Sequence, residues 1–367
     1  MLNQYLFKRV DNSALIVFRV LFGFLITVEA WGAIATGWIR TTLMEGEFTF
    51  NFIGLDFLQP LPGNGMLYYY GIMGLFGVFV MLGFKYRISI IVYSIMWSAV
   101  YLMQKSSYNN HYYLLMLLLG IMACMPANRY LSLDVKQNPD LKKISMPRWV
   151  YIVIIAQLWI VYTYASAAKF YPDWLDASMA AQLMLAKSNY WLIGDFLQLN
   201  WVHWSIAYFG IFFDLFIIPA LLWKPTRKFA FIFSIFFHLF NSFVFQIGIF
   251  PYMSLAFTVF FFPSETIQRI FLPQKELYTA GEIIKPANYK LMLVVAAIYF
   301  IIQIGLPLRH WVISDDVLWT EEGHRLHRVL CLLRVVAFSK TTTRSRHKTR
   351  CNLAILSTYK KRLCRKR

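Results

Sequence analysis

The chain has 367 residues, of which 59% are hydrophobic and 15% are charged, and its mean hydropathy is +0.52. A soluble domain carries about 25% charged residues, so the composition excludes an ordinary soluble protein and indicates one that crosses a membrane several times. The net charge of +18 belongs to the end of the chain, because residues 326–367 hold thirteen Lys or Arg and no Asp or Glu. Residues 1–325 keep a net charge of only +5. We therefore expect no nucleic-acid partner.

Apolar runs of about 20 residues, long enough to span a bilayer, predict an all-α bundle of about eight to nine transmembrane spans. A ninth run is short and could be a thin span or a re-entrant hairpin. The eight long runs are Ser13–Trp38, Met66–Phe84, Ile88–Met103, His111–Ala127, Trp149–Ala168, His203–Trp223, Phe229–Ile249 and Tyr289–Leu308, and the short run is Tyr252–Pro263.

Lysine and arginine set the predicted orientation, because positive residues collect on the cytoplasmic side. With a cytoplasmic N-terminus and the short run counted as a crossing, sixteen basic residues fall inside and five outside. The predicted outer face is periplasmic in a bacterium and lumenal in a eukaryotic secretory membrane. Two outer segments are unusually apolar: Asn51–Gly65 is expected to fold back over the bundle, and Asp173–Trp191 is expected to form an amphipathic helix in the interface.

The stretch from Tyr162 to Trp174 contains the strongest candidate for chemistry. Four small residues, Ala165 to Ala168, allow close approach of a neighbouring helix or a flat ligand, and Pro172 ends the helix. Lys169 lies between them, at the predicted membrane edge. Loss of water favours the neutral amine there, which is a usable base. The alternative is a lysine that only snorkels to the interface.

Five further polar residues fall inside predicted spans, where each would be unfavourable against lipid. We expect them to face the interior of the bundle, either as structural hydrogen-bond partners or around a polar cavity. Arg19 and Glu29 are ten residues apart in the first span, roughly 15 Å along a helix, so each should pair with another helix. The other three are Asp214, His238 and Asn241.

Motifs of nucleotide-binding proteins, zinc hydrolases and serine hydrolases are absent, and the four cysteines lack metal-ligand spacing. No metal site is expected. Polar clusters remain at the outer ends of three predicted helices, Lys105–Tyr113, the Lys169 stretch and Phe237–Ser242. For His111 alone, a hydrogen-bonded interface histidine is the simpler interpretation.

These clusters, in their order along the chain, resemble the vitamin K-dependent gamma-carboxylases and their bacterial homologues, the horizontally transferred transmembrane (HTTM) domain family. The likeness covers about residues 10–325. The matching segments are Arg19-Val20-Leu21-Phe22-Gly23, Pro60-Leu61-Pro62, Tyr86-Arg87-Ile88-Ser89, Lys105-Ser106-Ser107-Tyr108-Asn109-Asn110-His111, Ala127-Asn128-Arg129-Tyr130, Ala168-Lys169, Asp173-Trp174, Asp214, Phe237-His238-Leu239-Phe240-Asn241-Ser242 and Ile247-Gly248-Ile249-Phe250.

The resemblance implies an enzyme that couples oxygenation of vitamin K hydroquinone to carboxylation of peptide glutamate. It implies that Lys169 deprotonates the hydroquinone, that dioxygen then generates a stronger base, and that the glutamyl carbanion captures carbon dioxide. Asn110 and His111 would be partners of the hydroquinone and of the amine. A supporting set is expected to bind the cofactor: Asn109, Tyr108, His238, Asn241 and Asp214.

The resemblance also defines the expected domains: residues 1–308 as the HTTM domain and residues 309–325 as the start of a β-rich extramembrane domain. Residues 326–367 lose all acidic residues and show poor strand periodicity. Our hypothesis is that this basic tail is disordered or translated out of frame, with the β-rich domain truncated or absent. Carboxylation would then be in doubt, because peptide binding in the family involves that domain.

The alternative function is a carboxylation-deficient or non-enzymatic membrane protein that binds quinone or lipid, or a transporter. A transporter is expected to show repeated halves with broken helices, and the sequence shows no internal repeat. The membrane fold and the family resemblance together imply three partners: membrane lipid, a naphthoquinone and a Glu-containing peptide.

Overall fold

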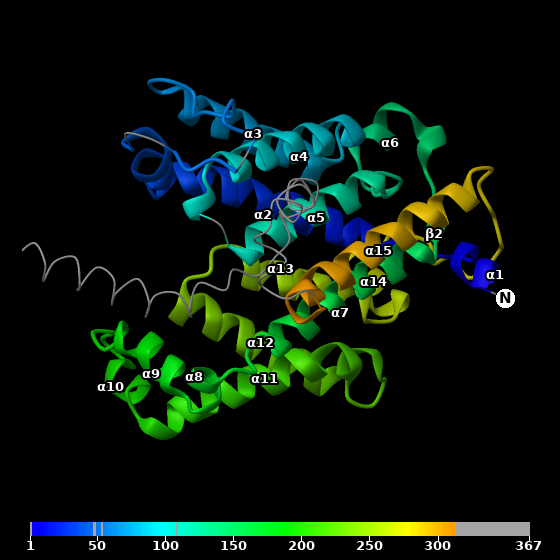
Figure 1. Ribbon diagram of the computed structural model, residues 1–367. Helices are drawn as coiled ribbons and strands as arrows, with labels where there is room; N and C mark the ends of the chain where they lie inside the picture. Colours follow the sequence, from blue (N-terminus) through cyan, green and yellow to red (C-terminus); the bar gives the residue numbers. More distant parts are fainter. Residues whose placement is uncertain (1, 47–48, 53, 108, 313–367) are drawn as a thin grey trace, which may run out of the picture. The chain divides into compact units, whose positions relative to one another are not determined.

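The structure, a computed structural model, describes residues 2–46, 49–52, 54–107 and 109–312, and helices dominate it (Figure 1). The elements before the middle of the chain are α1 (Leu2–Phe7), β1 (Arg9–Asp11), α2 (Ser13–Ala35), a π-helical turn (Arg40–Met44), α3 (Gly65–Leu82), α4 (Tyr86–Met103), a 3₁₀ turn (Lys105–Ser107), α5 (Asn110–Cys124), α6 (Leu133–Gln137), a 3₁₀ turn (Pro139–Leu141) and β2 (Ser145–Pro147). The remaining elements are α7 (Trp149–Ala167), α8 (Pro172–Leu175), α9 (Ser178–Leu185), α10 (Gly194–Leu197), α11 (Asn200–Leu222), α12 (Arg227–Phe240), a π-helical turn (Asn241–Phe245), α13 (Phe250–Phe257), a 3₁₀ turn (Thr258–Phe260), α14 (Ser264–Phe271) and α15 (Tyr289–Val312).

Among the described residues, six helices are long and apolar enough to cross a membrane: α2, α3, α4, α7, α11 and the continuous segment Arg227–Phe245. Three shorter apolar helices cover Asn110–Cys124, Phe250–Phe260 and Tyr289–Gly305. Each apolar run of the sequence therefore forms a helix, which confirms the predicted all-α polytopic membrane fold. The short run forms α13 and the following 3₁₀ turn, most of whose residues are buried.

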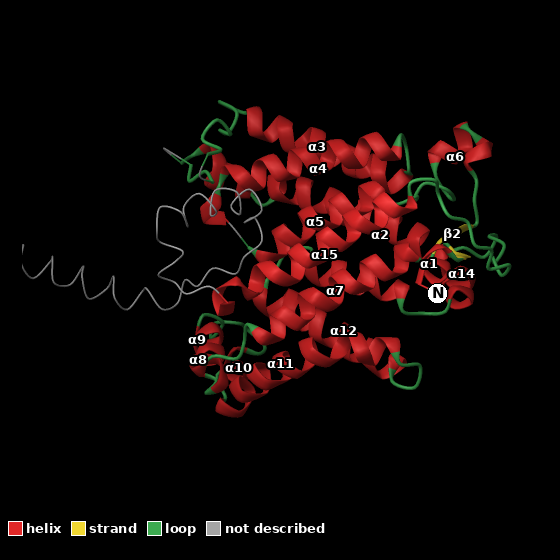
Figure 2. Ribbon diagram, turned by 45° about the vertical axis from the view of Figure 1, so that its right-hand side comes forward, coloured by secondary structure: helices red, strands yellow, loops and turns green. Residues whose placement is uncertain are grey.

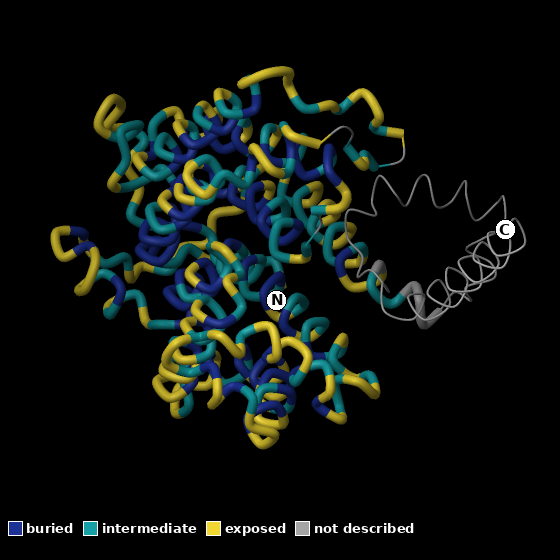
Figure 3. Tube along the Cα trace, turned by 90° about the vertical axis from the view of Figure 1, so that its left-hand side faces the viewer, coloured by how far each residue is buried: buried dark blue, intermediate teal, exposed yellow. Residues whose placement is uncertain are grey.

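Helix α2 is the central element, since 72% of its most apolar window is buried, against 22–44% for the other five long helices. It packs closely along α3, where a Cβ on Gly23 would lie 2.3 Å from the backbone nitrogen of Met81. On another face the Phe18 ring stacks on Phe257 of α13, with ring centroids 4.6 Å apart. Buried stretches alternate with exposed ones along the helices of the bundle (Figure 3).

The short elements collect at the two ends of the helices (Figure 2). One end holds α1, α6, β2 and α14, and the opposite end holds α8, α9 and α10. Strands β1 and β2 pair antiparallel, with Val10 opposite Met146. The first end carries segments that the sequence assigns to the cytoplasm, and the second carries the Lys169 stretch. The distribution agrees with the predicted topology, whose orientation in the membrane stays a prediction.

Arg19 in α2 is fully buried and donates to backbone carbonyls of the turn after α5. Its guanidinium lies 3.2 Å from the oxygen of Ala127 and 3.3 Å from that of Tyr130. Arg19 therefore pairs with another segment and not with Glu29, as its position in the helix indicates. Gly83 ends α3 beside this guanidinium with φ of +64°, a conformation that glycine adopts readily. A Cβ there would lie 2.7 Å from the Arg19 guanidinium, so the close approach requires glycine.

The predictions for the two apolar segments, residues 51–65 and 173–191, compare differently with the structure. The fold-back predicted for Asn51–Gly65 holds only in part: Lys105 donates its amide to the carbonyl of Phe50 and Phe52 stacks on Tyr101, whereas Phe57 and Leu61 are 76% and 47% exposed. The expected single amphipathic helix over residues 173–191 is wrong. The chain instead forms the short helices α8 and α9, because Asp176 accepts a bond from the Ser178 amide and Ala177 takes φ of +61° between them.

A buried ion pair joins the start of the chain to the segment after α14. The Lys275 ammonium lies 2.6 Å from the Asp11 carboxylate, and the two side chains are 0% and 2% exposed. Asp11 also accepts bonds from the amides of Ser13 and Tyr278. Removing one partner of such a pair leaves a buried charge without compensation.

Lys275→Met is therefore expected to destabilise the protein by about 3–5 kcal/mol, measured as a fall in thermal unfolding temperature in detergent. The control is Lys224→Met, since Lys224 is exposed just beyond α11. Equal stability of the two variants would show that the Asp11–Lys275 pair does not hold this end together.

Candidate functional site

Helix α7 delivers Lys169 to the end of the bundle that holds α8, α9 and α10. The helix ends at Ala167, and the Lys169 backbone amide then bonds to the carbonyl of Ser166. The Lys169 Nζ donates to the carbonyl of Ala165 at 3.1 Å and lies 5.7 Å from the centre of the Trp174 ring. The side chain is only 21% exposed. The lysine therefore turns toward the protein interior rather than snorkelling into solvent.

Asp214 of α11 is the ion-pair partner of Lys169, and its side chain is 7% exposed. The small residues of this contact let α7 and α11 approach: Ser166 donates to the carbonyl of Ile211 at 3.1 Å, and Gly210 faces the Lys169 stem. The sequence predicts an interior position for Asp214 but does not identify its partner. The packing of α7 on α11 makes Asp214 the hydrogen-bond acceptor of the Lys169 amine. The resemblance predicts Asn110 and His111 as the partners of that amine.

The Asn109–His111 corner begins α5. The Asn109 side chain caps the helix by accepting a bond from the Tyr112 amide at 2.8 Å, so it has a structural role that explains its position. Asn110 is exposed at the first turn, and His111 is partly buried. Tyr108, also predicted to bind the cofactor, lies outside the described residues.

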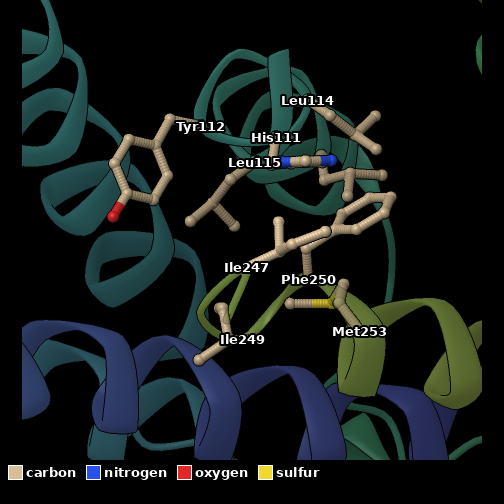
Figure 4. A pocket seen from close by; sticks show the side chains of 9 residues that line it. His111, Tyr112, Leu114, Leu115, Ile247, Ile249, Phe250 and Met253 are labelled. Carbon is tan, nitrogen blue, oxygen red and sulfur yellow. The ribbon is translucent and has the colours of Figure 1, made fainter. Parts of the chain in front are cut away.

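His111 faces a small apolar hollow (Figure 4). Its imidazole lies against the Phe250 ring, with ring centroids 4.1 Å apart. The other lining residues are Tyr112, Leu114, Leu115, Leu118, Ile247, Ile249 and Met253. The hollow encloses about 20 Å³, which is room for roughly one water molecule.

Glu29 of α2 borders the same region. The Tyr112 hydroxyl and the backbone at Ile249 are hydrogen-bonded to its carboxylate. A Cβ on Gly248 would lie 3.5 Å from Glu29 Oε2, so the carboxylate also runs beside the segment that lines the hollow. Glu29 thus ties α2 to α5 and to the turn before α13, as expected for a polar group inside a bundle.

His238 of α12 is 1% exposed, and its Nε2 lies 3.0 Å from the hydroxyl of Tyr162 on α7. Tyr162 is also hydrogen-bonded to Ser254 of α13. The other imidazole nitrogen of His238, Nδ1, is buried without a hydrogen-bond partner among the described residues. Asn241, predicted beside His238, starts the π-helical turn Asn241–Phe245, a feature that often accompanies functional sites.

Aromatic rings connect the lysine and the histidine corner. Phe213, next to Asp214, lies 5.7 Å from the His238 ring. His238 lies 6.4 Å from Phe250, which contacts His111. A series of ring contacts thus runs from Phe213, the neighbour of Asp214, through His238 and Phe250 to His111. Neither Lys169 nor Asp214 lines the His111 hollow.

Sequence reasoning missed Tyr162 as a site residue, although a signal was present. Tyr162, Ser166 and Lys169 are spaced at i, i+4 and i+7, which places them on one face of a helix. All three side chains make contacts with α11 or α12 in the structure. That spacing indicates a polar stripe that requires partners on a neighbouring helix.

The described chain is a polytopic helical membrane protein that holds a lysine–aspartate pair and two histidines between its helices, at one end of the bundle. Comparison with known families is consistent with this class: residues 7–265 match the HTTM domain, and residues 288–359 match the lumenal domain of vitamin K-dependent gamma-carboxylase. The chain belongs to the HTTM domain family and, with both domains, to the gamma-carboxylase family. No solved structure matches it.

The lumenal-domain match begins at residue 288, within the expected HTTM domain, and continues through most of the basic tail. Residues 313–367 lie outside the described residues. The boundaries at 308 and 325, and the out-of-frame hypothesis for the tail, therefore stay predictions. Reading the coding region tests the hypothesis, and an intact frame through residue 367 would contradict it.

Asp214→Leu is expected to destabilise the protein by about 1–3 kcal/mol, because the mostly buried Lys169 ammonium loses its carboxylate partner and keeps only the Ala165 carbonyl as an acceptor. The double variant Lys169→Met with Asp214→Leu should recover most of the loss. A thermal double-mutant cycle in nanodiscs measures the coupling, and strictly additive effects would show that the ion pair does not link α7 to α11.

Proposed function

We propose that this protein is a gamma-glutamyl carboxylase-like membrane enzyme. It would oxygenate a reduced naphthoquinone, of the vitamin K hydroquinone type, and couple that oxidation to carboxylation of glutamate in a peptide. Dioxygen and carbon dioxide would be co-substrates. The observation that carries the proposal is the Lys169–Asp214 pair, a candidate base held between α7 and α11 with little exposure. Family membership supports the same reaction.

The pair supplies a route to a neutral amine. In water the charged lysine and aspartate are favoured, but burial penalises both charges. Transfer of the proton from Lys169 Nζ to Asp214 leaves a neutral amine hydrogen-bonded to a neutral acid, and a dry site favours this state relative to water. Lys169 would then accept a proton from a bound hydroxyl that reaches it past the rings between the ion pair and the His111 hollow. Asp214 holds the amine in place and retains the displaced proton.

The residues around His111 suit a quinol by their chemistry. An imidazole and a tyrosine stand among aliphatic and aromatic side chains, which is typical of small-molecule sites. His111 would hold a ring hydroxyl, with Asn110 as its neighbour on the first turn of α5. The hollow has room for one water, so the lining segment Ile247–Phe250 must move aside to admit a ring. A reduced naphthoquinone bound there would supply the electrons for dioxygen and the strong base that a glutamyl γ-proton requires.

The remaining polar residues would support the site. His238 is held by Tyr162 between the ion pair and the hollow, and Asn241 begins the adjoining π-helical turn. The row of Phe213, His238 and Phe250 would exclude bulk water from the reaction. We propose that this end of the bundle faces the periplasm or lumen and that the N-terminus is cytoplasmic, as the basic residues indicate.

Lys169→Ala is expected to abolish formation of quinone epoxide from vitamin K hydroquinone while the protein stays folded, because the amine is the proposed base. The measurement is quinol-dependent oxygen uptake and epoxide yield in nanodiscs. Lys224→Ala, an exposed lysine just beyond α11, is the matched control. Epoxidation by Lys169→Ala at the wild-type rate would overturn the assignment.

The coupled step is tested separately with labelled carbon dioxide and a Glu-containing peptide. Wild-type protein is expected to incorporate label into the peptide only when reduced naphthoquinone and dioxygen are present. Epoxide without incorporated label would indicate a quinol oxygenase deficient in carboxylation. Absence of quinol-dependent oxygen uptake would favour a non-enzymatic protein that binds quinone or lipid.

A further inference from the structure

Three segments that are far apart in the sequence meet at the end of the bundle that holds α1 and β2 (Figure 2). We call them the N-terminal clasp, and they are residues 2–11, 145–148 and 281–290. Strand β1 pairs with β2, and the residue before β1, Lys8, forms an antiparallel bridge with Ile283. The Arg9 amide donates to the carbonyl of Glu282 at 2.6 Å. Backbone bonds therefore join the three segments into one small surface.

Three basic side chains lie on this surface. The Arg148 guanidinium lies 4.5 Å from the centre of the Tyr5 ring, and the Arg148 amide donates to the carbonyl of Lys8 at 2.9 Å. The side chain of Lys8 runs across Gly281, where a Cβ would lie 2.7 Å from Lys8 Cε. The third basic residue, Lys285, is exposed and comes two residues after the bridge partner of Lys8. The contacts of the clasp thus gather three cations.

The protein supplies no ion-pair partner to these cations among its described residues, since the two salt bridges found there involve other lysines. Glu282, the acidic residue in the same segment as Lys285, lies near Arg9, which also donates to Ser145. Cations that are gathered without a counter-charge attract an anion from outside the protein. The clasp therefore has the charge of an anion-binding surface.

Exposed apolar side chains accompany the cations on the clasp. They come from α1 and from the segment before α15, and each is 50–67% exposed. The four are Leu2, Tyr5, Ile283 and Ile284. A surface that combines basic and exposed apolar side chains is typical of protein segments that lie in the interface of a membrane.

The cations stand where apolar helices begin. Arg148 directly precedes α7, which is long and apolar enough to span a membrane, and Lys285 comes four residues before the start of α15. A basic residue at the start of a spanning helix lies at the level of the lipid head groups. The neighbouring apolar side chains then reach the boundary between head groups and acyl chains. A soluble anion would leave them uncovered, whereas a phospholipid covers them.

We propose that the N-terminal clasp binds an anionic phospholipid. Its phosphate lies between Lys8 and Arg148, Lys285 adds a third positive charge, and the acyl chains cover the exposed apolar side chains. Phosphatidylcholine carries a cation on its own head group, so it gains less from this surface than phosphatidylglycerol does. The inference is independent of the proposed function, because the clasp lies at the end of the bundle opposite to α8, α9 and α10.

Native mass spectrometry of the full-length protein in detergent measures the binding of single lipids. Wild-type protein is expected to bind phosphatidylglycerol more tightly than phosphatidylcholine. The double variant Lys8→Gln with Arg148→Gln should lose roughly 30-fold in affinity for phosphatidylglycerol, since each basic residue near a membrane surface contributes about five-fold. Its affinity for phosphatidylcholine should not change. Equal affinity of the wild-type protein for the two lipids would overturn the proposal.

The matched control is Lys224→Gln with Lys228→Gln, which removes two exposed basic residues at the connection between α11 and α12. It should keep the wild-type affinity, and an equal loss in both double variants would overturn the clasp as a site and indicate diffuse attraction. Excess inorganic phosphate should not displace the lipid, and displacement would contradict a lipid ligand. The thermal unfolding temperature of each lipid-free variant shows whether it is folded. If Lys8→Gln with Arg148→Gln unfolds, the exposed Lys285→Gln decides, with an expected loss of about five-fold.

Discussion

The pairing of Lys169 with Asp214 is the interaction on which the candidate site depends. A buried charge without a partner is unfavourable, and helix packing supplies each of these two residues with the other as its partner. The pairing requires α7 and α11 to approach closely, which Ser166 and Gly210 permit. The same contact keeps the amine of Lys169 close to an acceptor for its proton. The fold and the proposed chemistry therefore both require α7 and α11 to lie in contact.

The polar residues of the bundle divide into two groups by their contacts. Arg19, Asp11 and Lys275 bind backbone or one another at the end that holds α1, β2 and α14. Asn109 caps α5. The motif residues Arg19 and Asn109 therefore have structural roles that explain their presence. The other group lies toward the opposite end and holds the Lys169–Asp214 ion pair, His238 and His111. Aromatic rings lie between the ion pair and His111.

The segment Gln246–Phe250 borders the His111 hollow with irregular backbone. It follows a π-helical turn, carries two residues with positive φ, and lines the His111 hollow. Irregular backbone at membrane depth is tolerated where it lines a cavity. The neighbouring bond between Glu29 and Tyr112 anchors α2 and α5 beside this segment. The hollow is therefore fixed on its α5 side and bounded by irregular chain on the other.

The sequence by itself determined the all-α membrane fold, because a continuous apolar run such as Trp149–Ala168 satisfies its backbone in lipid as a helix, whereas barrel strands alternate apolar and polar residues. It also determined that Asp214 and His238 lie inside the bundle, since lipid excludes them. It could not assign their partners, because Lys169 and Asp214 are 45 residues apart and only the packing of α7 on α11 brings them together. The sequence pattern likewise predicted one helix over residues 173–191, whereas a local turn at Asp176 and Ala177 divides this segment into two helices. Helical periodicity reports which face is apolar, while contacts between helices arise only in three dimensions.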